Sequence, residues 1–143
     1  MTPTLPEIMT SFAVALSTPM PPEATGDYMA GRVGMLSMLA ALAGQEAERG
    51  PAARVWENGA IRAVLGEAAG RYDAAFDGAL AKAAAEVDTD FTWSGLDAAN
   101  AALRRLLIAL HERVETAGDN DLDRRIIGLY AQMAHERRLD LGG

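Results

Sequence analysis

Apolar residues recur along much of the chain at intervals of three and four, the spacing that buries one face of an α-helix. Ile8, Phe12 and Leu16 follow this spacing and predict a first helix over residues 5–17. Thr4 and Glu7 are expected to form a capping box at its start. The three prolines that come next end this helix. They make residues 18–26 a stiff, proline-rich connection.

Two further helices are predicted on either side of a Gly-Pro step. An apolar stripe runs through residues 27–49, and we expect Gly50 to end this helix as its C-cap. Pro51 then occupies the favoured first position of the next helix, which covers residues 51–68. We expect that helix to be continuous through the turn-forming pair Asn58-Gly59, because the apolar periodicity resumes directly afterwards.

The C-terminal half of the chain predicts three more helices with short connections. They cover residues 71–87, 95–117 and 121–138, and Ser94 is expected to be the N-cap of the second. In that second helix Leu96, Leu103 and Leu110 repeat at intervals of seven, and so do Asn100, Leu107 and Val114. This spacing is typical of bundle packing. The last five residues, 139–143, are expected to form a loose tail.

The predicted fold is therefore all-α: a single-domain, up-and-down bundle of five or six helices over residues 1–143. Composition agrees with this fold. Half of the residues are apolar but only 6% are aromatic, and strands favour aromatic and β-branched residues more than helices do.

Charge and composition narrow the classes of partner and compartment. The formal net charge is −7, which disfavours nucleic acid as a partner because binding it requires a basic face. No basic leader precedes an apolar run, and no stretch of about 18 apolar residues occurs, so we expect neither secretion nor membrane insertion. The chain has no cysteine, which fits a reducing compartment. We expect a cytoplasmic protein.

Side chains that commonly perform catalysis are scarce. The chain has one lysine, Lys82, and two histidines, His111 and His135. Neither histidine has a glutamate three residues before it, so the carboxylate-bundle metal pattern is missing. We therefore predict no catalytic residue, no metal site and no cofactor.

Arg32 and Glu46 are polar residues on the apolar face of the second predicted helix. They lie about 21 Å apart along a helix and cannot pair with each other. The simpler interpretation is that both side chains reach solvent near the helix ends. The alternative is a polar groove, in which Arg104 and His111 also line the wall.

Gly31 and Gly34 fall inside the second predicted helix. Each costs about 1 kcal/mol relative to alanine in a helix interior. Such a cost suggests a compensating gain. We expect close packing against a neighbouring helix, with a bound ligand as the alternative.

Two segments carry a resemblance to a known family. The stretch Tyr28–Leu65, YMAGRVGMLSMLAALAGQEAERGPAARVWENGAIRAVL, and the end of the chain, GLYAQMAHERRLDL, resemble a family of small all-helical bacterial proteins without assigned activity. Members are often encoded beside a kinase-like phosphotransferase and an acyl-CoA dehydrogenase. The resemblance implies an accessory role near acyl-CoA metabolism, and it assigns no functional residue.

Our leading hypothesis is a non-enzymatic helical protein that acts through interaction, as a homodimer or as an accessory to an enzyme. Abundant apolar helix surface supports this hypothesis. It includes Met29, Met35 and Met38, and methionine adapts to varied partners.

Two other hypotheses remain. In the first, a groove binds a small ligand, with Arg32 or Arg104 meeting an anionic head group and apolar side chains meeting an acyl tail. The second is an enzyme that uses Glu46 with His111. It is the least favoured, because nothing in the sequence places those two residues together.

Overall fold

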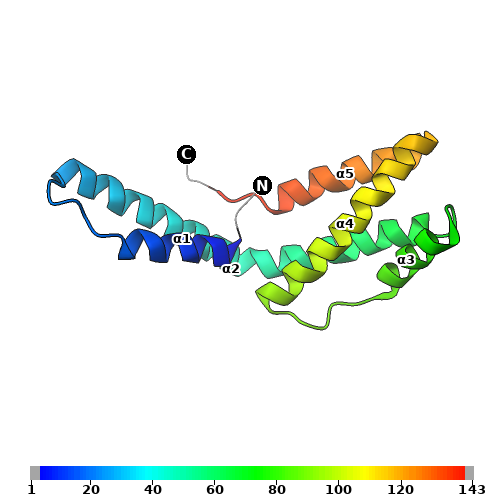
Figure 1. Ribbon diagram of the computed structural model, residues 1–143, viewed down its shortest axis with the longest axis horizontal. Helices are drawn as coiled ribbons and strands as arrows, with labels where there is room; N and C mark the ends of the chain where they lie inside the picture. Colours follow the sequence, from blue (N-terminus) through cyan, green and yellow to red (C-terminus); the bar gives the residue numbers. More distant parts are fainter. Residues whose placement is uncertain (1–3, 141–143) are drawn as a thin grey trace. The chain divides into compact units, whose positions relative to one another are not determined.

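The computed structural model describes residues 4–140, which form five α-helices and no strand (Figure 1). The all-α fold class is confirmed, and five helices fall within the predicted range. The helices are α1 (Leu5–Ser17), α2 (Gly26–Ala68), α3 (Ala74–Ala85), α4 (Trp93–Ala117) and α5 (Asn120–Glu136).

The chain divides into two compact units, and the division falls inside α2, between Gly50 and Pro51. Among the described residues, the first unit holds 4–50 and 137–140, and the second holds 51–136. The single-domain organisation stays a prediction. Within the described part of the chain, no helix combines the length and apolar character needed to cross a membrane.

The two helices expected on either side of Gly50 are in fact one. Pro51 lies inside α2, so the prediction that Gly50 is a C-cap is wrong. A residue before proline normally avoids the helical conformation, partly because its Cβ meets the proline ring. Gly50 has no Cβ, and this relieves the clash and lets the helix pass through the pair. The predicted continuity through Asn58-Gly59 is confirmed.

In the first unit, α1 and the first half of α2 form an αα-hairpin (Figure 1). The start of α1 carries the predicted capping residues: Glu7 accepts a hydrogen bond from the backbone N–H of Thr4 at 2.7 Å. The hydrophobic core of this unit is small. Three buried residues form it, Ile8, Leu42 and Ala43, and Leu5, Leu39 and Leu139 pack against them.

The described end of the chain belongs to this core. Gln45 donates to the backbone oxygen of Asp140 at 2.7 Å and accepts from its backbone N–H at 2.8 Å. Leu139 packs beside the buried leucine of α2. The expectation of a loose tail is therefore wrong for residues 139 and 140, and residues 141–143 lie outside the described part.

The second unit has a much larger core, built from the second half of α2 and from α3, α4 and α5. α5 runs back along α4 (Figure 1). Gly118 makes the turn between them in the left-handed conformation, with φ of 68°, which glycine adopts without strain. The buried core residues are Ile61, Val64, Leu65, Ala68, Phe76, Leu80, Leu103, Leu107, Leu110, Val114, Leu122, Ile126, Leu129 and Met133.

Two helix starts differ from the prediction. α4 is capped by Thr92, whose side chain accepts from the backbone N–H of Gly95 at 3.1 Å, so the assignment of Ser94 as N-cap is wrong. α3 begins later than predicted because Asp73 caps it and accepts from the backbone N–H of Phe76.

Candidate functional site

The N-terminal hairpin, meaning α1 and residues 26–44 of α2, presents two apolar stripes to solvent. On α1 the stripe consists of Met9, Ala13 and Leu16, at intervals of four and three. On α2 small residues repeat at intervals of four, three and four, and all of them are exposed: Ala30, Gly34, Ser37 and Ala41. We call these two stripes together the hairpin outer face. Their spacing is that of helix faces that pack against other helices.

Large apolar side chains are also exposed elsewhere on the first unit. Among the described residues, eight large hydrophobic side chains of the first unit are 46–58% exposed: Met9, Val14, Leu16, Met20, Tyr28, Val33, Met35 and Met38. Single exposed apolar residues are ordinary, but eight in so small a unit favour a surface that contacts a partner.

The hairpin is also almost free of charge. Between Ile8 and Gln45 the charged residues are Glu23, Asp27 and Arg32. The first two lie at the turn between the helices, and the guanidinium of Arg32 is occupied by the other helix. An apolar partner that binds the hairpin outer face therefore displaces water from few charged groups.

Arg32 closes the C-terminal end of α1. Its Nη2 donates to the backbone oxygen of Thr18 at 2.9 Å and to that of Ala15. The last carbonyl groups of a helix have no partner within the helix and carry partial negative charge. Arg32 of α2 supplies hydrogen-bond donors and a positive charge to these carbonyl groups. It therefore holds α1 and α2 together at this end of the hairpin.

The glycines of this helix are not explained by packing within the chain. A Cβ built on Gly31 or Gly34 meets nothing within 4 Å. The expected close approach of a neighbouring helix is therefore wrong for the described residues of this chain. The open space is available to a molecule from outside.

Glu46 lies deep in the first unit, with 6% of its surface exposed. The interpretation that its side chain reaches solvent is wrong, because the start of α1 and the end of the chain pack around this stretch of α2.

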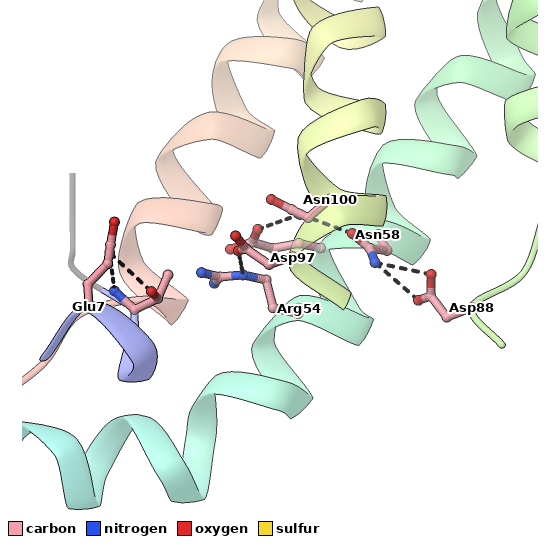
Figure 2. Close-up of polar contacts among 8 residues, drawn as sticks. Glu7, Arg54, Asn58, Asp88, Asp97 and Asn100 are labelled. Carbon is pink, nitrogen blue, oxygen red and sulfur yellow. Dashed lines mark hydrogen bonds and ion pairs between the residues drawn. The ribbon is translucent and has the colours of Figure 1, made fainter. Parts of the chain in front are cut away.

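The second unit contains a buried polar network that joins α2, α4 and the loop before α4. Figure 2 shows five of these side chains where the helices and the loop meet: Arg54, Asn58, Asp88, Asp97 and Asn100. The network consists of Arg54, Glu57, Asn58, Arg62, Asp88, Asp97 and Asn100. Four of its members, Arg54, Glu57, Asn58 and Asn100, are at most 2% exposed.

Asn100 lies at the centre of the network. Its amide nitrogen donates to Glu57 Oε2 at 2.9 Å and to Asn58 Oδ1 at 3.0 Å. Arg54, also buried, donates from Nε to Asp97 at 3.0 Å and stands 5.4 Å from the ring centre of Trp93. Because buried charges need partners, these contacts fix how α4 sits on α2.

Asp88 ties the loop to α2. Its carboxylate accepts from Arg62 Nη2 at 2.7 Å and from Asn58 Nδ2 at 3.1 Å. The hydrogen bond from Arg62 is the largest cause that holds the pKa of Asp88 below its usual value, against the opposing effect of burial. Asp88 is thus a charged anchor for an otherwise extended segment.

Sequence reasoning missed this network. Asn58 was interpreted only as a turn signal, and Asn100 only as a member of a heptad stripe with Leu107 and Val114. The available signal was the spacing of Arg54, Glu57 and Asn58, which places three polar side chains on one face of an apolar helix.

Two of the four predicted groove residues, Arg104 and His111, each interact with Tyr130 of the second unit, Arg104 through its charge and His111 through its ring. The ring of His111 lies 5.6 Å from that of Tyr130. Burial is the main cause that raises the pKa of Tyr130, and the charge of Arg104 opposes it. The four-residue polar groove stays a prediction.

His111 also bridges α4 and α5. Its Nε2 lies 2.8 Å from Asp123 Oδ1 and 3.9 Å from Glu115 Oε1, and the three side chains offer ligand atoms within 4.8 Å of one another. Glu115 is 65% exposed. We interpret the contact between His111 and Asp123 as a hydrogen bond that joins two helices.

No family model, curated protein or solved structure matches this chain. The resemblance to the family of small helical bacterial proteins therefore stays a prediction.

Proposed function

We propose that this chain is a non-enzymatic interaction protein that self-associates through the hairpin outer face. The observation that carries the proposal is the contrast within the first unit. Three buried residues form its core, while eight large apolar side chains remain exposed around it. A second copy covers those side chains, and two hairpins together make a four-helix bundle.

The distribution of charge is compatible with a second copy as the partner. Two chains of net charge −7 repel each other. An interface on the hairpin outer face places the nearly uncharged part of each chain at the contact. A two-fold arrangement brings the large residues of α1 in one copy against the small-residue stripe of α2 in the other.

The available area is sufficient for a modest interface. Along α1 and residues 26–44 of α2, a contact strip about 10 Å wide covers about 500 Å² on each copy. The two copies together bury about 1,000 Å², which is near the lower limit for a specific interface. We therefore expect a dimer that dissociates on dilution.

Several polar side chains support a non-enzymatic role, because structural bonds account for them. Arg32 closes α1, His111 pairs with Asp123, and the polar network holds α2, α4 and the loop. An accessory role beside an enzyme is compatible with the same surface. In that case a different helical protein, and not a second copy, binds the hairpin outer face.

A glutamate placed in the small-residue stripe tests this proposal. We expect Gly34→Glu to convert the protein from dimer to monomer in size-exclusion chromatography with light scattering, since it introduces a charge at the contact. Gly128→Glu is the matched control, because a Cβ at Gly128 of α5 also meets nothing within 4 Å. Both changes improve helix propensity. A monomeric unaltered protein, or a Gly34→Glu variant as dimeric as the control, contradicts the proposal.

A further inference from the structure

α3 and α4 leave a groove between them because short side chains occupy their facing positions. On α3 these are Ala79 and Ala83, one turn apart. On α4 they are Ala99, Ala102 and Ala109, which share one side of the helix. The groove has a volume of about 490 Å³, within the range of about 300–1,000 Å³ that small-molecule sites occupy. Its wall is therefore apolar and open along its length.

Cationic side chains from three helices border this groove: Arg62 of α2, Lys82 of α3 and Arg105 of α4. Glu86 is the acidic residue among those that line it. The chain as a whole has a net charge of −7, so a group of three cations makes this region locally positive in a negative protein. Lys82 is the single lysine of the sequence. The groove therefore combines an apolar wall with a positive rim.

Two of these three cations are available to a ligand. Within residues 4–140, the side chains of Lys82 and Arg105 form no hydrogen bond or ion pair. Arg62 pairs with Asp88 through Nη2, but its Nε is buried and has no hydrogen-bond partner among the described residues. Arg62 is therefore held by the fold, and Lys82 and Arg105 are the two cations that can meet an anion.

We propose that this groove binds a single-chain fatty carboxylate. The acyl chain lies along the alanine-lined wall, over Leu103 and Leu106, and gains the free energy of apolar burial. The carboxylate is held at the rim by Lys82 and Arg105. The site lies wholly within the second unit and does not depend on self-association of the first.

Decanoate is a suitable probe, and isothermal titration calorimetry with the full-length protein is the measurement. We expect saturable binding of one decanoate per chain. Decanol lacks the charge and decyltrimethylammonium reverses it, so each is expected to bind at least about tenfold more weakly. If the unaltered protein does not bind decanoate, the proposal is wrong.

Two variants with matched controls locate the binding. Arg105→Gln removes a rim charge and is expected to weaken decanoate binding about tenfold. Arg138→Gln removes an exposed arginine of the first unit and is expected to leave binding unchanged. Ala102→Leu fills the groove and is expected to abolish binding, while Ala101→Leu alters the neighbouring exposed position of α4 and preserves it.

Circular dichroism confirms that each variant keeps its helical content. Decanoate that binds equally well to Arg105→Gln and Ala102→Leu sits elsewhere, for instance on the hairpin outer face, and that outcome overturns the assignment. Loss of self-association in Gly34→Glu leaves the groove intact, so the two proposals fail separately.

Discussion

Asn58 and Asn100 belong to different sequence patterns, yet their side chains meet in the core of the second unit. Each pattern describes one face of a single helix. Which side chains pair between two helices depends on which of their faces meet. The leucines of α4 could be assigned to an apolar stripe because their spacing alone predicts one. The partners of Asn100 could not be predicted, because a polar residue on an apolar stripe does not specify which donor or acceptor faces it.

Removing the amide of Asn100 is expected to destabilise the protein. Asn100→Ala leaves the buried carboxylate of Glu57 without this donor, and we expect a loss of about 2–3 kcal/mol in the free energy of unfolding, measured with urea. Glu112→Ala, at an exposed position of the same helix, is the control and is expected to change it by less than about 0.5 kcal/mol. Equal effects of the two changes would show that the network is not buried as described.

The ion pair of Asp88 with Arg62 predicts a dependence of stability on pH. Because the folded state lowers the pKa of Asp88 from 3.8, its contribution is complete above that pH. The contribution is lost as the pH falls through the lower folded pKa. Asp88→Asn breaks the pair, and at pH 7 we expect it to cost about 3 kcal/mol.

The difference in unfolding free energy between the unaltered protein and Asp88→Asn is then expected to shrink below about pH 4. Urea unfolding at a series of pH values measures it. Glu112→Gln provides a control whose difference stays small throughout. If the difference in unfolding free energy between the unaltered protein and Asp88→Asn stays constant or increases in acid, the prediction is wrong.

Helix boundaries were predicted well where a local signal acts alone and poorly where two signals compete. α1 has the bounds that its capping residues and prolines indicate. At the start of α4, Thr92 and Ser94 are both good caps, and the sequence does not rank them. At Gly50-Pro51 the usual stop-and-start signal is overridden, because glycine before proline tolerates the helical conformation.

The start of α4 gives a test of capping at the level of one helix. Thr92→Ala removes the acceptor for the backbone N–H of Gly95, and we expect a loss of about 1 kcal/mol. Ser94→Ala leaves that bond in place and is expected to be close to neutral. Thermal unfolding of the two variants compares them directly, and the reverse order would restore Ser94 as the cap.

Replacing Pro51 tests whether α2 is one helix. In a continuous helix, Pro51→Ala restores a backbone hydrogen bond and relieves a steric conflict, so we expect stabilisation by about 1–3 kcal/mol. If a helix started at this position, proline would be favourable there and its loss would be neutral or destabilising. Urea unfolding distinguishes the two.

For the molecule as a whole, the helical class and the amphipathic stripes could be predicted from the sequence. Which of these stripes are buried by other helices of the chain could not. The stripe of α4 is buried by three other helices of its unit. The stripes of the hairpin outer face have the same kind of spacing but remain exposed. Periodicity shows that a face is apolar, and only the arrangement of neighbours shows whether the chain itself covers it.

Hydrogen exchange at two protein concentrations tests the central claim, self-association through the hairpin, most directly. Dimer formation stabilises the interface by mass action. We therefore expect the amides of α1 and of residues 26–44 to exchange more slowly at about 100 μM than at about 1 μM, while those of α4 do not change. Identical exchange of the hairpin at both concentrations, or a change confined to α4, would contradict the account.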